Sequence, residues 1–135
     1  MNNHRKIIRV RDVMKTGFDM TDGMATVAEA LRDAKHPETK SLLIRKRNEN
    51  DEFGFVSYSD IAQHVLARDR APERVNLYEI MTKPVLSVSP SMDIRYCARL
   101  FENFGIERAP VIEKGEVIGI VGYTDMVLLG IQPEA

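Results

Sequence analysis

Two aspartates, each at the end of a repeated seven-residue segment, are the side chains of this sequence best suited to bind a sugar. Residues 54–60 read GFVSYSD and residues 119–125 read GIVGYTD, so Gly, Val, Tyr and Asp recur at the same spacing. The carboxylates of Asp60 and Asp125 can each accept hydrogen bonds from two adjacent sugar hydroxyls. Each segment has the pattern of a buried strand, a tight turn and an Asp that opens a helix, where free N–H groups favour phosphate. The motif therefore predicts two places for a phosphorylated sugar, although an Asp at a helix start is also a common cap.

The repeated motif belongs to a longer tandem duplication. Residues 12–14 (DVM) match residues 79–81 (EIM), and these two segments lie 67 positions apart. Asp60 and Asp125 lie 65 positions apart, so the first copy has about two extra residues. A duplication of this length indicates two related structural units, each of which would be only marginally stable alone.

The duplication divides the chain into five parts. We expect a basic N-terminal arm over residues 1–9, the first repeat over 10–67, a charged connector over 68–75, the second repeat over 76–131 and a tail over 132–135. The arm contains His4, Arg5 and Lys6 and is usually a solvated segment, but it could also reach ligand phosphates.

Hydrophobic periodicity predicts the same element order in both repeats. In the first, an extended stretch at 18–20 precedes a helix that begins at the capping box Thr26-x-x-Glu29 and ends before Pro37. Strands over 41–45 and 53–57 and a helix over 60–67 follow. In the second repeat, the expected elements are an extended stretch at 85–88, a helix from Asp93 to Gly105, strands at 110–112 and 117–121, and a helix at 125–129. We therefore predict an α+β fold, a tandem pair of strand-helix-strand-strand-helix units packed as a pseudo-two-fold module.

Composition excludes several classes of function. A net charge of −1 over 135 residues gives no overall electrostatic case for nucleic acid or a membrane surface. The single cysteine, Cys97, cannot form an intramolecular disulfide and is expected to be a buried apolar residue. His4, His36 and His64 do not have metal-ligand spacing with it, so no metal site is expected. We find no signal peptide pattern and no apolar run of membrane-spanning length, and we expect a cytoplasmic protein.

The ordered set of repeated segments resembles a CBS-domain pair, also called a Bateman module, from about Val10 to Ile131. The second copy matches more closely, with EIMT at 79–82, VSP at 88–90, GIERAPV at 105–111 and GIV at 119–121. The first copy departs more, because Lys40 is followed by SLL where the family often has a basic residue and then Leu-Pro. The resemblance implies a regulatory module, not an enzyme, that binds adenine nucleotides or related adenosyl ligands in the cleft between its repeats.

The ligand motif of this family is a Gly, two apolar residues, Ser or Thr, two variable residues and Asp. The first copy matches it fully, with Ser57 at the hydroxyl position and Asp60 at the end. The second copy has Gly122 at the hydroxyl position, and the neighbouring Thr124 could partly replace the missing group. Gly122 either removes one donor from the second site or provides a backbone conformation with positive φ.

The remaining expected contacts surround the two motifs. Arg108 could bind phosphate with two N–H groups, or could be an ordinary surface charge, and Lys40 is at nearly the equivalent place in the first copy. The apolar walls for an adenine ring are expected from Phe18, Val85, Leu86, Ala109 and Pro110. The expected contacts within the motifs also include Tyr58, Ser59 and Tyr123, of which the two tyrosines are equally suited to packing.

The main hypothesis is a free-standing sensor of AMP, ADP, ATP or a similar ligand that signals to an unidentified effector protein and requires no cofactor. The sequence contains no Ser-His-Asp or Cys-His arrangement and no P-loop, which argues against an enzyme. The alternative is a dimeric interaction scaffold that binds no ligand, which Gly122 and the divergent first copy favour. Under both hypotheses we expect a homodimer, because the two final helices carry a large apolar set: Ile61, Val65, Leu66, Met126, Val127, Leu128 and Leu129.

Overall fold

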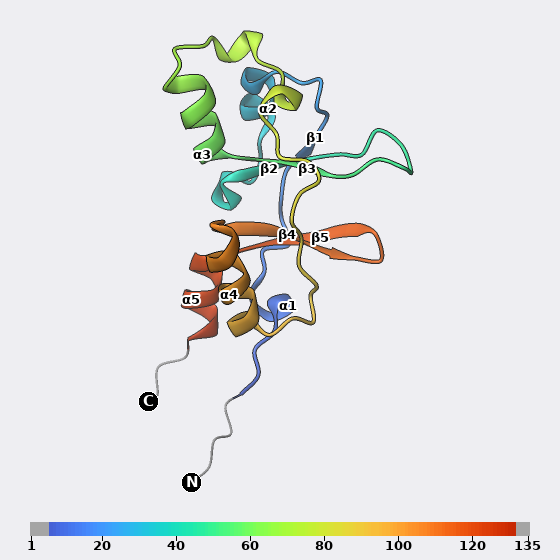
Figure 1. Cartoon of the computed structure of the whole chain (residues 1–135), viewed down its shortest axis with the longest axis vertical. Helices are drawn as coiled ribbons and strands as arrows, with labels where there is room; N and C mark the ends of the chain where they lie inside the picture. Colours follow the sequence, from blue (N-terminus) through green and yellow to red (C-terminus); the bar gives the residue numbers. More distant parts are fainter. Residues whose placement is uncertain (1–5, 132–135) are drawn as a thin grey trace. The chain divides into compact units, whose positions relative to one another are not determined.

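The chain forms two compact units. The computed structural model describes residues 6–131, so the first five residues of the predicted arm and the predicted tail over 132–135 lie outside the described residues. One unit comprises Gly17–Val85, and the other combines the segment up to Thr16 with the segment from Leu86 onward. Each unit has a small sheet with its longer helices on one face (Figure 1).

The compact units divide the chain differently from the sequence repeats, because each repeat contributes its first segment to the other unit. Lys15 and Ile120 exchange backbone hydrogen bonds of 2.8 and 2.9 Å. These bonds attach the segment up to Thr16, which begins the first repeat, to the strands of the second repeat. Thr82 and Phe55 exchange two such bonds, both 2.9 Å. These bonds attach the segment up to Val85, which begins the second repeat, to the strands of the first repeat. The predicted repeat boundaries thus describe the sequence duplication. In the structure, each compact unit instead combines most of one repeat with the first segment of the other.

The unit Gly17–Val85 contains a three-stranded sheet. Strand β1 (Met20–Thr21) pairs in parallel with β2 (Ser41–Ile44), which pairs antiparallel with β3 (Gly54–Ser57). Helix α2 (Val27–Asp33) begins at the predicted capping box, in which the Thr26 hydroxyl accepts from the Glu29 N–H and Glu29 accepts from the Thr26 N–H. The other helical segments are η1 (Pro37–Thr39), α3 (Tyr58–Ile61), the π-helical η2 (Ala62–Leu66), η3 (Pro72–Arg74) and η4 (Leu77–Glu79).

The other unit has the same order of elements, except that a single β-bridge replaces the first strand. A single parallel bridge between Val88 and Val111 lies where the predicted extended stretch at 85–88 meets the sheet. Helix α4 (Ile94–Phe104) begins at Asp93, whose carboxylate accepts from the Arg95 N–H, and ends at Gly105 with a φ of 64°. The remaining elements are α1 (Val10–Val13), the antiparallel strands β4 (Arg108–Glu113) and β5 (Glu116–Gly122), and α5 (Tyr123–Gly130).

The mixed α+β class and the element order are therefore confirmed, with one correction at the motif helices. We expected these helices to begin at Asp60 and Asp125, but α3 begins at Tyr58 and α5 begins at Tyr123. The residue before each helix, Ser57 or Gly122, is the N-cap. The aspartates are consequently the third residues of their helices and bond back to the cap.

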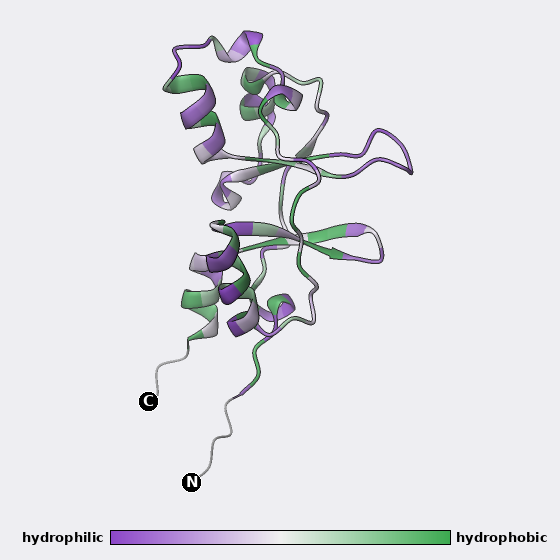
Figure 2. Cartoon of the chain, viewed as in Figure 1, coloured by the Kyte–Doolittle hydropathy of each residue, from purple (hydrophilic) through white to green (hydrophobic). Residues whose placement is uncertain are grey.

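The apolar cores explain why several residues of the motif helices are not at the surface. Ile61 and Val65 belong to the core of Gly17–Val85, and Met126 belongs to the core of the other unit. These three residues therefore cannot contribute to the expected apolar surface. Leu66, Val127 and Leu128 are 76%, 53% and 70% exposed, and Figure 2 shows the hydrophobic character of α5. Among residues 6–131, we find no helix with the length and apolar character needed to span a membrane.

Cys97 lies on the buried face of α4 and is fully inaccessible, as predicted. Burial raises the pKa of its thiol to about 11. Because the thiolate is the reactive form, we expect native protein at pH 8 to react very slowly with Ellman's reagent. The measurement is the rate of thiol release with and without urea, and we expect one thiol per chain to react once the protein unfolds. Rapid reaction of the folded protein would contradict this burial.

Candidate functional site

The first motif forms a closed set of local hydrogen bonds around Asp60. The Asp60 Oδ2 atom accepts from the Ser57 N–H at 2.9 Å, and the Ser57 hydroxyl accepts from the Asp60 N–H at 3.0 Å. The Tyr58 N–H donates to the carbonyl of Lys40 at 2.9 Å. Several amides that could have bound phosphate are thus already used, but the Ser57 hydroxyl can still donate its proton. In the part of the chain that the structure describes, no hydrogen bond or ion pair reaches the second oxygen of Asp60, Oδ1.

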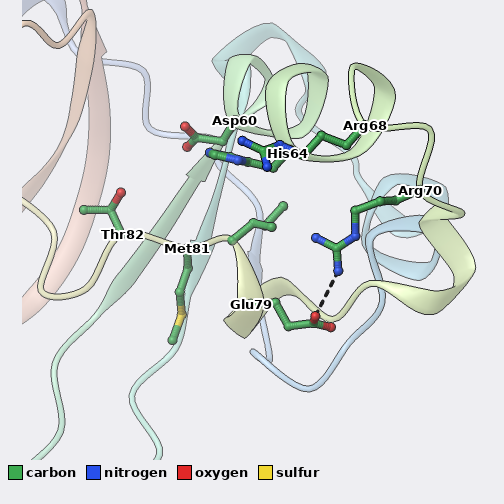
Figure 3. A pocket seen from close by; sticks show the side chains of 8 residues that line it. Asp60, His64, Arg68, Arg70, Glu79, Met81 and Thr82 are labelled. Carbon is green, nitrogen blue, oxygen red and sulfur yellow. Dashed lines mark hydrogen bonds and ion pairs between the residues drawn. The ribbon is translucent and has the colours of Figure 1, made fainter.

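Asp60 lines a pocket of about 510 Å³ inside the unit Gly17–Val85. His64 follows it in η2 and Arg68 in the turn after η2, and Thr82 comes from the segment after η4 (Figure 3). The other lining residues are Arg70, Glu79, Ile80 and Met81. The pocket therefore combines a carboxylate and a hydroxyl with nearby cationic groups.

Part of the charge in this pocket is already compensated. The Arg70 guanidinium donates to Glu79 Oε1 at 3.0 Å. The pKa of Glu79 is lowered, first by a hydrogen bond from the Asn76 N–H and then by Arg70. No ion pair within residues 6–131 involves Arg68, so its guanidinium remains available to an anionic ligand group.

The second motif has a different environment. The Asp125 Oδ2 atom accepts from the Gly122 N–H at 2.9 Å, as in the first copy. The other oxygen, Oδ1, is paired with the ammonium group of Lys15. Asp125 is also only 7% exposed. Both of its oxygens therefore have protein partners, unlike those of Asp60.

Gly122 does not adopt a left-handed conformation. Its φ is −135° and its ψ is 171°, which is extended backbone that any residue can adopt. The alternative that glycine is needed for positive φ is therefore wrong. A Cβ atom at this position would lie 3.3 Å from the Glu107 carbonyl oxygen, so a small side chain fits only closely.

Lys15 was not identified from the sequence, although the duplication contained a signal for it. The offset of 67 residues that relates residues 12–14 to 79–81 also relates Lys15 to Thr82. The structure bears out this equivalence, because Lys15 bonds to Ile120 and Thr82 bonds to Phe55 at matching positions of the two hairpins. A lysine thus pairs with the motif aspartate in one copy, and a threonine lines the same pocket as the motif aspartate in the other.

Comparison with known proteins gives the family. A family model described as CBS domain matches residues 77–130. The hexameric CBS-CP12 protein from bloom-forming cyanobacteria is 33% identical, with a TM-score of 0.86 over 91% of this chain and 68% of that chain. The chain belongs to the CBS-domain family. The family-model match lies within the second sequence repeat.

Other similar proteins extend this comparison. An uncharacterized protein of Methanopyrus kandleri is 32% identical over 82 residues, which are 59% of this chain and 42% of that protein. The chain thus spans less than half the length of this curated relative. The CBS domain pair of protein MJ0100, crystallised with 5′-methylthioadenosine and S-adenosyl-L-methionine, has the same fold at 23% identity, a TM-score of 0.76 and 92% and 96% coverage of the two chains.

The predicted phosphate-binding residues are not equivalent in this CBS pair. Lys40 accepts from Tyr58 through its carbonyl, as Glu107 accepts from Tyr123 at 3.1 Å, so Lys40 corresponds to Glu107. Arg108 pairs with Gly122 in the hairpin, and its counterpart opposite Ser57 is Ser41. Arg108 is half-buried, and its guanidinium makes no hydrogen bond or ion pair to any residue in the range 6–131.

The two tyrosines of the motifs are packing residues. Tyr123 contacts Phe101 edge-to-face with ring centroids 5.4 Å apart, and Tyr58 packs against the core of its unit. Burial, and then the charges of Asp19 and Glu38, raise the pKa of Tyr58. Neither tyrosine is placed as an open stacking platform.

The predicted adenine walls are only partly accessible. Ala109 is fully buried in the core of its unit, so its side chain offers no surface to a ligand in this conformation. Pro110 is buried as well, whereas Phe18, Val85 and Leu86 are half-buried. Ser59 and Thr124 are exposed next to the motif aspartates. The role of each of these residues stays a prediction.

Proposed function

We propose that this CBS pair is a regulatory module that binds an adenosine-containing ligand through the first motif. The observation that carries the proposal is the Asp60 carboxylate, which faces a pocket with one oxygen that no residue in the range 6–131 occupies. A ribose could donate hydroxyl protons to this oxygen, and the hydroxyls of Ser57 and Thr82 are available for further hydrogen bonds. The MJ0100 structure supports the ligand class, since it contains two adenosyl compounds on the same fold.

The cationic groups of the pocket favour a phosphorylated ligand. His64 in η2 and Arg68 in the turn after η2 follow Asp60 along the chain, and both line the pocket. Phosphate oxygens would pair with such groups, whereas a positively charged sulfonium would not. Within the adenosine class we therefore propose AMP, ADP or ATP ahead of S-adenosylmethionine.

Identification of the ligand tests this proposal. Small molecules released from purified protein by heat would be analysed by mass spectrometry, and melting curves would be recorded with AMP, ADP, ATP, S-adenosylmethionine and UMP. We expect an adenine nucleotide to raise the melting temperature, because a ligand that binds only the folded state stabilises it. UMP is the control for nonspecific phosphate binding. Equal shifts with UMP and AMP would contradict adenosine recognition.

A second candidate function is a dimeric scaffold that binds no small molecule. The observation that favours it is the second motif, whose carboxylate is already paired with Lys15. No melting shift with any of the ligands, together with an intact dimer, would support the scaffold.

In either case we propose that the module acts as a homodimer and that its regulatory output passes to a separate protein. The exposed Leu66, Val127 and Leu128 are more apolar surface than a solvated helix end requires. We expect light scattering to give about twice the chain mass of 15.3 kDa, and Leu128→Glu to shift the protein to monomer. Leu31→Glu on α2, also at an exposed leucine, is the matched control and should remain dimeric. A monomeric wild-type protein at micromolar concentration would contradict this expectation.

The N-cap of α5 offers a further stability test. Gly122→Ser would place a hydroxyl where Ser57 caps α3, and this oxygen could accept from the Asp125 N–H. We expect the free energy of unfolding to rise by a few tenths to about 1 kcal/mol, measured by urea denaturation. A loss of stability would mean that the close approach to the Glu107 carbonyl outweighs the new cap.

A further inference from the structure

Lys15 is bonded to the second motif through both its backbone and its side chain. Its backbone exchanges two hydrogen bonds with Ile120, at 2.8 and 2.9 Å, so the residue is fixed beside the strand that leads into the motif. Its ammonium group pairs with Asp125 Oδ1, while Asp125 Oδ2 accepts from the Gly122 N–H. The Lys15 side chain is about one-third exposed, at 34%, and that of Asp125 is 8% exposed. Lys15 thus occupies the Oδ1 atom of Asp125, whereas no residue in the range 6–131 occupies the Oδ1 atom of Asp60.

The first motif provides an internal comparison. Thr82 is fixed to Phe55 by the same two backbone bonds, both 2.9 Å, but its side chain is short and uncharged. Asp60 is half-buried and faces the 510 Å³ pocket that Thr82 also lines. Besides the difference between Ser57 and Gly122 at the N-cap, the two sites thus differ at this equivalent position, which carries an ammonium group in one copy and a hydroxyl in the other.

This difference has a direct consequence for sugar binding. A ribose can reach the Asp125 carboxylate only if its hydroxyls replace the ammonium group of Lys15. The replacement exchanges an ion pair, in which both groups are charged, for hydrogen bonds in which only the carboxylate is charged, so it is unfavourable. The displaced ammonium, on a side chain that is only about one-third exposed, would also lose its charged partner.

We propose that Lys15 closes the second motif to ribose, so that the CBS pair binds one adenosine-containing ligand per chain, at Asp60. The stoichiometry rests on the proposed function, whereas the closure of Asp125 by Lys15 can be tested even if the first motif binds nothing. Lys15 is in this sense a specificity-determining residue that acts by occupying the carboxylate.

Calorimetric titration of AMP, ADP, ATP and S-adenosylmethionine into matched variants tests the proposal. We expect wild-type protein to bind one ligand per chain and Asp60→Asn to lose this binding. The double variant Lys15→Thr/Asp60→Asn frees the Asp125 carboxylate while the first site is removed, and it should bind at least tenfold more tightly than Asp60→Asn alone. Adding Asp125→Asn to it should abolish the new binding, and Lys15→Arg/Asp60→Asn, which keeps the charge, should not bind.

The reciprocal variant covers the case in which Lys15→Thr does not fold. Thr82→Lys places an ammonium group beside Asp60 and should weaken wild-type binding at least tenfold, with a melting curve that still shows a folded protein. Unchanged binding by folded Thr82→Lys would overturn the proposal.

The outcomes separate this inference from the proposed function. If wild-type protein binds two ligands per chain, or if folded Lys15→Thr/Asp60→Asn binds none, Lys15 does not close the site. If wild-type protein binds none of the four ligands, the proposed function at Asp60 fails. In that case binding by Lys15→Thr/Asp60→Asn would still support the closing role of Lys15, and its absence would overturn it.

Discussion

Asp60→Ala is expected to weaken adenine-nucleotide binding by roughly ten- to a hundredfold, because about 1.5–3 kcal/mol of charge-assisted hydrogen bonding to ribose is lost. Asp125→Ala should have a much smaller effect on binding, since Lys15 already occupies that carboxylate. Isothermal titration of both variants with the nucleotide that shifts the wild-type melting curve most is the measurement. Equal losses for the two variants would contradict the assignment of the site to the first motif.

The Asp60→Ala experiment needs a control for local unfolding, since the substitution also removes the acceptor of the Ser57 N–H. Asp33→Ala removes a carboxylate of the same unit whose side chain is 72% exposed and, among residues 6–131, pairs only with the neighbouring exposed Arg32. We expect it to bind like wild type. A melting curve of Asp60→Ala near that of wild type would show that the lost affinity reflects the missing carboxylate and not a disordered α3.

Local sequence patterns predicted the elements of the fold well because their physical causes span only a few residues. The capping box at Thr26 and Glu29 acts across three positions, and Gly105 ends α4 through its own positive φ. The helix predicted to begin at Asp60 begins two residues earlier, at Tyr58, because Ser57 and not Asp60 is the N-cap. Either residue type is a good cap, so composition alone does not decide between them.

The features that the sequence did not yield depend on contacts between distant segments. Lys15 and Asp125 are 110 positions apart, and nothing local to Lys15 indicates its partner. The exchange of first segments between the CBS domains brings them together, and this exchange depends on where the apolar residues of α1 can be buried. Val10 and Val13 are buried in the same core cluster as Cys97 and Phe101. The duplication would have pointed to Lys15 only if its offset had been followed one residue beyond the matching segment.

Asp125→Asn is expected to destabilise the protein by about 2–4 kcal/mol, although it is predicted to matter little for ligand binding. Removal of one partner of a buried ion pair leaves the other charge uncompensated, which costs about 3–5 kcal/mol when both groups are fully buried. Lys15 keeps about one-third of its side-chain exposure, so water can partly solvate it and the cost should lie somewhat lower. Urea denaturation gives the free energy of unfolding directly, and the melting temperature should fall by roughly 6–15 °C.

The equivalent substitution in the first copy separates this effect from helix capping. Asp60→Asn retains an oxygen that can accept from the Ser57 N–H and breaks no ion pair, so we expect it to cost about 1 kcal/mol or less. A double-mutant cycle of Lys15→Ala with Asp125→Asn should then show a coupling of about 1 kcal/mol or more, because the two residues act as a pair. A similar loss of stability for Asp60→Asn and Asp125→Asn, with no coupling to Lys15, would mean that the carboxylates serve only as helix caps. A large asymmetry would instead show that the duplicated aspartates have diverged, one held for a ligand and the other used to attach the N-terminal segment to its domain.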